Sequence, residues 1–207
     1  LSLRLDFTKQ GPTVDLDGIT GSIAGEKVTG SVHLDQSGAK TRFSLIGSAG
    51  SVSLPSLLGV LVAWHRTPST EEMLGAVGAN TSEVWPLRGF SLGLIEKVEG
   101  GITLEAKTLA LGSAVKLEDA ALTASVGKDA LAVTSLKGRL FGGDFAASGS
   151  LAPRGNGAEL AARAEVKGGK LGELAESVTG SPLARGPFDL AFDVQGEGLS
   201  PPGVVSG

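Results

Sequence analysis

The 207-residue sequence contains no cysteine and no tyrosine, and aromatic residues make up only 4% of it. The absence of cysteine excludes disulfides, cysteine-ligated zinc, iron–sulfur clusters and a thiol nucleophile. The net charge of −4 provides no basic surface, which argues against a nucleic-acid partner. No run of 18 apolar residues occurs, so no segment is predicted to cross a membrane as a helix.

Glycine, in contrast, is abundant, with 32 residues. Each glycine inside a helix costs about 0.5–1 kcal/mol relative to alanine, so a large helical protein is disfavoured. The glycines have no three-residue period, which excludes collagen, and the hydrophobic content of 41% argues against disorder.

Apolar and polar residues alternate at both ends of the chain. In Leu1–Thr8 every second residue is apolar, and the same pattern returns in Phe188–Gln195. This period of two predicts strands with one buried face. Further strands are predicted at Thr13–Leu16, Ser22–Ala24, Lys27–Leu34, Thr41–Ile46, Gly101–Leu111, Ala114–Leu117, Ala121–Val126, Ala130–Leu136, Asp144–Leu151 and Glu159–Val166.

Turn signals such as Gly-Gly and Asp-Gly separate these strands, which predicts long hairpins between sequence neighbours. Helices are expected only near Leu54–Ala79, as an excursion packed on the sheet, and at Leu171–Val178. The predicted fold class is therefore mainly β: a repetitive antiparallel sheet curled into a groove, with a few short helices. The apolar run Leu54–Trp64 fits a buried helix better than one that touches lipid or a partner.

The chain contains an internal repeat. Gly21 and Gly25 have the same spacing as Gly138 and Gly142, which lie about 117 positions later in the chain. Each pair of glycines precedes a further strand and a helix candidate. We expect residues 1–207 to be one fragment of a longer protein, with repeat units at about 1–90 and 91–207 and a helical excursion at 54–79.

Few residues suggest catalytic or metal chemistry. His33 and His65 have no partner at a metal-like spacing, so both are expected to be structural or solvated. Asp189 and Asp193 fit a solvated strand face better than acid–base or calcium chemistry. Gly21–Lys27 lacks the spacing of a phosphate loop. We expect no enzyme activity, no metal and no cofactor; the rival is a hydrolase that uses serine with one of the two histidines.

The second half of the chain resembles the AsmA-like family of bacterial envelope proteins. The resemblance rests on the glycine-rich hairpin Gly138–Gly143, the short helix Leu171–Gly180 and the strand Gly186–Ser200, and Phe90–Gly127 also fits. It implies a periplasmic protein of a Gram-negative bacterium, anchored in the inner membrane by a segment outside this chain. It also implies roles in outer-membrane assembly and phospholipid transport, with other envelope proteins as further partners.

The apolar strand faces then predict a lipid-contacting groove formed by Leu3, Leu5, Phe7, Ile102, Leu104, Phe188, Leu190, Phe192 and Val194. From the residues alone, the core of a closed sandwich explains these rows equally well, and the family resemblance favours the groove. The alternative function is an envelope scaffold that contacts other proteins through its sheet edges without transporting lipid.

Overall fold

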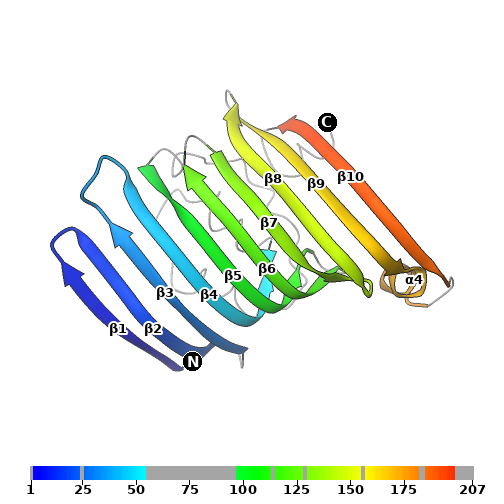
Figure 1. The fold of residues 1–207 in the computed structure, drawn as a ribbon, viewed down its shortest axis with the longest axis horizontal. Coiled ribbons are helices and arrows are strands. Elements are labelled where there is room, and N and C mark those ends of the chain that lie inside the picture. Colours follow the sequence, from blue (N-terminus) through cyan, green and yellow to red (C-terminus); the bar gives the residue numbers. More distant parts are fainter. Residues whose placement is uncertain are drawn as a thin grey trace.

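The computed structural model describes residues 2–23, 26–54, 97–112, 115–127, 130–154, 157–181 and 185–198. They form ten strands and one helix in chain order (Figure 1). The elements are β1 (Ser2–Gln10), β2 (Thr13–Ile23), β3 (Glu26–Asp35), β4 (Thr41–Ser53), β5 (Val98–Ala110), β6 (Lys116–Gly127), β7 (Ala130–Leu140), β8 (Gly143–Arg154), β9 (Gly157–Lys170), α4 (Leu171–Thr179) and β10 (Pro187–Gly198).

All ten strands belong to one sheet whose spatial order follows the sequence from β1 to β10. The sheet is open, because β1 pairs only with β2 and β10 pairs only with β9 in the described residues. The prediction of a mainly β fold built from sequence neighbours is confirmed. A closed sandwich is not what these strands form.

One pairing departs from the hairpin expectation. Strands β4 and β5 are parallel, from Thr41 opposite Val98 to Ser53 opposite Ala110. A parallel pair cannot be joined by a tight turn and needs a crossover connection. The two strands are accordingly separated by residues 54–97, where the predicted excursion at 54–79 lies almost entirely outside the described residues.

Two strands each span what the sequence pattern predicts as two shorter strands, because β-bulges carry them across the expected breaks. Asp17-Gly18 is a turn signal, yet β2 continues through it with Gly18 at φ +59° and a register shift between Leu16 and Ile19. In β6, Asp119 at φ +48° has the same effect. A bulge absorbs one extra residue without ending the strand, so the predicted breaks at these two places are wrong.

The repeat has a counterpart in the positions of these irregularities. The register shift between Leu16 and Ile19 in β2 corresponds to a shift between Val133 and Leu136 in β7. Each bulge is followed by a strand that pairs back across it, β3 in the first case and β8 in the second. The two halves of the sheet therefore bend at equivalent points.

The predicted helix at Leu171–Val178 is confirmed as α4. It ends at Gly180, whose φ of +73° suits a left-handed cap, and the Gly180 N–H donates to the carbonyl of Glu176 at 2.9 Å. The Leu171 N–H donates to the carbonyl of Gly186, also at 2.9 Å. These bonds hold the helix at the end of β9, where β9 and β10 meet.

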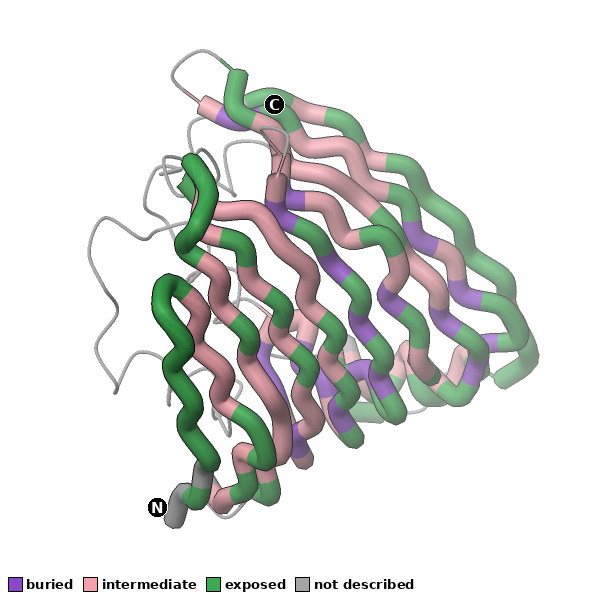
Figure 2. Tube along the Cα trace, turned by 60° about the vertical axis from the view of Figure 1, so that its left-hand side comes forward, coloured by how far each residue is buried: buried purple, intermediate pink, exposed green. Residues whose placement is uncertain are grey.

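The main core lies on one face of the sheet, toward the end of the strands where α4 is found. Leu109 and Leu117 are its most deeply buried side chains, and Phe141 and Phe188 pack against it with ring centroids 6.4 Å apart. A second, smaller cluster lies toward the opposite end of the strands and consists of Val126, Leu131 and Ala158. Figure 2 shows the buried positions concentrated on the middle strands.

Adjacent glycines in β5 provide a test of the parallel pairing. A Cβ on Gly100 would overlap the carbonyl oxygen of Phe43 in β4, whereas a Cβ on Gly101 would meet nothing within 4 Å. We expect Gly100→Ala to lower the free energy of unfolding by about 1–3 kcal/mol, because overpacking displaces backbone. The matched Gly101→Ala should be neutral or stabilise by up to about 1 kcal/mol. Urea unfolding of both variants checks this, and equal effects would contradict the pairing.

Candidate lipid-binding face

Strand register places at least one apolar residue from each of the ten strands on the same face of the sheet, which we call the apolar face. One line of paired residues, the central row, crosses the sheet from edge to edge. Each strand contributes one apolar residue to it, in the order Phe7, Leu16, Val32, Leu45, Ile102, Ala124, Val133, Gly149, Ala162 and Val194. Nine steps of about 4.8 Å between strands make this row about 43 Å long.

A second line, the helix-side row, runs parallel to the central row on the side of α4. It consists of Ile19, Gly30, Gly47, Leu104, Leu122, Leu136, Ala147, Ala164 and Phe192. Neither row contains a charged or polar side chain. The apolar face is therefore continuous across strands that are far apart in the sequence.

Exposure varies along the apolar face. At its two edges large side chains face solvent: Phe7 is 59% exposed, Leu190 49% and Phe192 47%. On the middle strands the corresponding side chains are buried, as for Leu122 at 7% and Leu136 at 5%. The outer parts of the apolar face thus have the exposure that a ligand with an apolar surface would need.

Of the predicted lipid-contacting residues, those in β5 and β10 and Phe7 in β1 lie on this shared face, but not in one cluster. Phe7, Ile102 and Val194 belong to the central row, and Leu104 and Phe192 belong to the helix-side row. Leu190 pairs with Val166, and Phe188 packs against the main core. In β1, Leu3 pairs with Gly21, and Leu5 lies at the register shift between Arg4 and Asp6.

Sequence reasoning missed several members of the same face. Val32, Leu45, Leu122 and Leu136 lie in the two rows, although the prediction named none of them. Their strands do alternate between apolar and polar residues, and that alternation was the available signal. It could not show that these strands align with β1 and β10, because alignment depends on register.

The opposite face, which we call the polar face, carries cross-strand ion pairs. Arg42 and Glu99 connect β4 to β5 at 2.7 Å, and Arg139 and Glu118 connect β7 to β6 at 3.1 Å. Arg154 lies within 4.0 Å of carboxylates on both β9 and β10, at 3.7 Å from Glu159 and 3.5 Å from Glu197. All these pairs are largely exposed, so solvent screens them and each contributes little to stability.

Hydrogen bonding shifts three pKa values on this face. The bond to Glu99 raises the pKa of Arg42, the bond to Glu118 raises the pKa of Arg139, and hydrogen bonds from Ser37 lower the pKa of Asp35. The arginines therefore stay charged at any physiological pH. Because the folded pKa of Asp35 is depressed, its contribution to stability is present above its unfolded pKa and is lost as the pH falls through the folded value.

Three of the residues considered for catalysis or metal binding have a hydrogen-bond or ion-pair partner on a neighbouring strand. His33 is exposed and hydrogen-bonds to Asp15 on the neighbouring strand. Asp189 accepts a bond from the Gly168 N–H at 2.7 Å, and Asp193 lies 3.8 Å from Arg163. No group of three or more metal-ligating side chains occurs in the described part of the chain, and His65 lies outside it.

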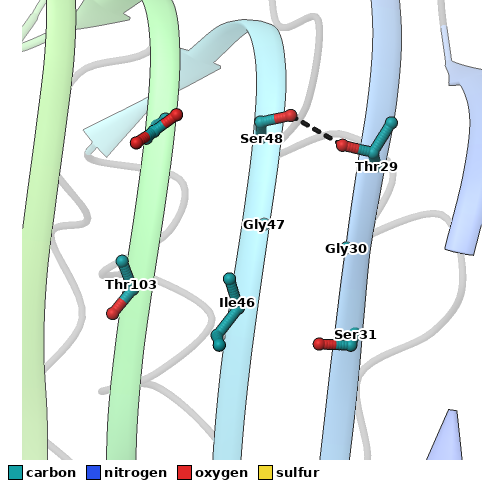
Figure 3. Close-up of a pocket in the computed structure, with 8 residues that line it drawn as sticks. Thr29, Gly30, Ser31, Ile46, Gly47, Ser48 and Thr103 are labelled. Carbon is teal, nitrogen blue, oxygen red and sulfur yellow. Dashed lines mark hydrogen bonds between the residues drawn. The ribbon is translucent and has the colours of Figure 1, made fainter. Parts of the chain in front are cut away.

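A shallow depression lies on the polar face, over β3, β4 and β5 (Figure 3). Ile46 lies in the depression and is 56% exposed. The neighbouring side chains that line the depression are polar. The hydroxyl groups of Thr29 and Ser48 form a hydrogen bond 2.7 Å long at one end of it. Its lining includes a single carboxylate, Glu105, and no aromatic side chain, so it offers little for recognising a ligand.

The comparison with protein families decides the family. The model of the AsmA family matches residues 71–207, which is more than half of the chain. The chain belongs to the AsmA family. This AsmA-family chain is therefore associated with the bacterial envelope, as the resemblance implied.

Comparison with curated proteins and with solved structures gives no match. Among the described residues of this AsmA-family chain, no helix has the length and apolar character needed to cross a membrane.

Proposed function

We propose that this chain is a segment of an envelope-spanning, membrane-anchored protein that holds or conducts phospholipid along its apolar face and so supports outer-membrane assembly. The observation that carries the proposal is the central row, in which every one of ten strands contributes an apolar residue from one sheet edge to the other. Membership of the AsmA family, an envelope-associated family, is consistent with this role.

The physical basis is non-specific burial of hydrocarbon. An acyl chain that leaves water gains about 0.8 kcal/mol per buried CH₂ group, without any polar recognition. Half-exposed Phe7, Leu190 and Phe192 provide apolar surface that such a chain would cover. The headgroup would stay in water, so the face would select for acyl chains rather than for one headgroup.

The cellular setting forms part of the same proposal. The protein would lie in the periplasm of a Gram-negative bacterium, be anchored in the inner membrane by a segment outside this chain, and act without enzymatic chemistry. Phospholipid would be its ligand, and other envelope proteins would be its further partners. The absence of polar groups from both rows supports a binding role over a catalytic one.

Photo-crosslinking from one strand tests the proposal. Leu190 and Asp193 both lie in β10, but Leu190 is on the apolar face and Asp193 is on the polar face. With benzoylphenylalanine at Leu190, we expect crosslinks to phospholipid in cells, and with the same group at Asp193 we expect none. Equal labelling at both positions, or none at Leu190, would reject lipid binding and leave the scaffold role as the explanation.

A further inference from the structure

The aromatic ring of Phe188 lies across a neighbouring strand. Phe188 in β10 pairs with Gly169 in β9, and a Cβ on Gly169 would come within 2.6 Å of two atoms of the Phe188 ring. From there the ring reaches Phe141, in the turn between β7 and β8, with ring centroids 6.4 Å apart and ring planes tilted by 45°. This is a usual geometry for an aromatic pair. The Phe188 side chain therefore passes over β9, at a position where a glycine leaves room for it.

The turn that carries Phe141 is fixed against β9. The Lys170 N–H donates to the carbonyl of Phe141 at 2.8 Å. A Cβ on Gly143, directly after the turn, would lie 2.5 Å from the backbone nitrogen of Gly169, so the two backbones approach closely. Phe141 itself has a φ of +51°, which a bulky residue rarely adopts. Such a conformation persists only where the surrounding structure imposes it, so these contacts set the position of the Phe141 ring.

Exposure along the apolar side of β10 changes at Phe188. Phe188 is part-buried and packs against the main core, whereas Leu190 and Phe192, the next two residues on that side, are 49% and 47% exposed. In the other direction the strand begins at Pro187, which pairs with Lys170, and α4 follows Lys170 directly. The ring therefore separates the exposed apolar surface of β10 from α4.

The apolar stretch of β10 beyond Phe188 matches one acyl chain in length. Leu190 and Val194 are separated by about 14 Å along the strand. The hydrocarbon core of a bilayer is about 30 Å thick, so an acyl chain of one leaflet spans about 15 Å. Beyond Val194 the next position on the same side is Gly196, which has no side chain. The stretch thus ends at an aromatic ring in one direction and at a glycine in the other.

We propose that Phe188 limits how far an acyl chain extends along β10 and so determines which chain lengths fit. The methyl end of the chain lies against the Phe188 ring, and the chain follows the strand from Leu190 to Val194. The headgroup then lies near Gly196. Phe141 contacts no lipid in this arrangement and is a positioning residue, because it holds the Phe188 ring across β9. The inference rests on the proposed function and deepens it.

Burial of hydrocarbon explains why the ring acts as a stop. Each CH₂ group that is buried on the apolar side strengthens binding by about fourfold. A chain that continued past Phe188 would have to displace the ring from the main core or leave its last CH₂ groups in water. In both cases the additional CH₂ groups bring no such gain, so the chain end stays at the ring.

Crosslinks mapped onto the acyl chain test this arrangement in the full-length chain. Benzoylphenylalanine is introduced at Leu190 or at Val194, and the protein is irradiated with vesicles of phosphatidylcholine that has saturated acyl chains. Tandem mass spectrometry then locates the linked carbon. Crosslinks from Leu190 should lie near the methyl end of the acyl chain, and crosslinks from Val194 should lie near the ester.

Phe188→Leu, combined with the label at Leu190, removes the stop. It keeps an apolar side chain in the main core, so the fold is retained, but a leucine is too short to cross β9. The share of Leu190 crosslinks near the methyl end should fall by at least about twofold in favour of carbons nearer the ester, because more of the chain can be buried beyond Leu190. Phe141→Leu should shift the linked carbon in the same direction.

Two controls separate the role of the ring from a general loss of apolar surface. Phe188→Tyr keeps the ring and should leave the linked carbon unchanged. Phe192→Ala removes an exposed phenylalanine from the same side of β10. It should reduce the amount of crosslinked lipid without moving the linked carbon.

The outcomes separate this inference from the proposed function. Absence of lipid crosslinks at both Leu190 and Val194 would reject lipid binding on β10, and this inference with it. Lipid crosslinks that are spread evenly along the acyl chain, or that Phe188→Leu leaves in place, would overturn the stop at Phe188 while lipid binding stands.

Discussion

Replacing Leu117 by alanine is expected to lower the free energy of unfolding by about 2–5 kcal/mol, the usual cost of a buried leucine truncation. Leu117 is 0% exposed and pairs with Leu109, which is 1% exposed, at the centre of the main core. The cavity would have no solvent access and few neighbours free to fill it. Urea unfolding, monitored through the β-sheet signal in circular dichroism, measures the change in the free energy of unfolding.

The control for this variant is Leu190→Ala, which removes the same atoms from a side chain that is 49% exposed. It should cost less than about 1.5 kcal/mol, because only part of the leucine surface is removed from water in the folded chain. Equal costs at Leu117 and Leu190 would mean that the edge of the apolar face is as well covered as the core. The proposed lipid surface would then not exist.

Local patterns were sufficient to predict the elements of this fold. Alternation identified β1 and β10, the glycine-rich turns identified the hairpins, and Gly180 identified the end of α4. These features depend on residues close together in the sequence, so a sequence-based argument can reach them. The mainly β architecture followed from them, whereas the open form was favoured over a closed sandwich only by the family resemblance.

Register and connection could not be predicted in the same way. The Asp17-Gly18 pair is a turn signal, but in β2 it forms a bulge, and a bulge shifts every later side chain by one position in the pairing. Without that shift, the alignment of Leu16 with Val32 and of Ile19 with Gly30 cannot be derived. The two rows of the apolar face became visible only through the pairing of all ten strands.

The parallel pair β4–β5 escaped prediction for a different reason. Thr41–Ile46 and Gly101–Leu111 were both predicted as strands, but nothing in either pattern specifies the direction of its partner. Direction is set by the length and course of the connection between them, which is a long-range property. The predicted residues Ile102 and Leu104 therefore lie next to Leu45 and Gly47, neighbours that the sequence did not suggest.

Introducing charge on the apolar side of β10 should abolish phospholipid binding without unfolding the protein. In the double variant Leu190→Asp/Phe192→Asp, two exposed apolar side chains become carboxylates beneath the proposed path of the acyl chain. Loss of two half-buried contacts of about 1 kcal/mol each, added to the cost of placing hydrocarbon against charge, should reduce bound lipid at least tenfold. Mass spectrometry of lipid extracted from the purified chain measures the amount.

The matched control adds the same charge to the other face of the same strand. Ala191 and Gln195 alternate with the apolar residues of β10 and are both exposed on the polar face, so Ala191→Asp/Gln195→Asp changes net charge equally. We expect this variant to retain wild-type lipid levels and to unfold within about 1 kcal/mol of the parent, because substitutions at exposed positions perturb stability little. The Leu190→Asp/Phe192→Asp variant should cost at most about 3 kcal/mol, because each of its two side chains is only half-buried. If the two variants lose lipid equally, the effect is one of overall charge and the apolar face is not the binding surface. If neither loses lipid, the acyl chains lie elsewhere than on β10.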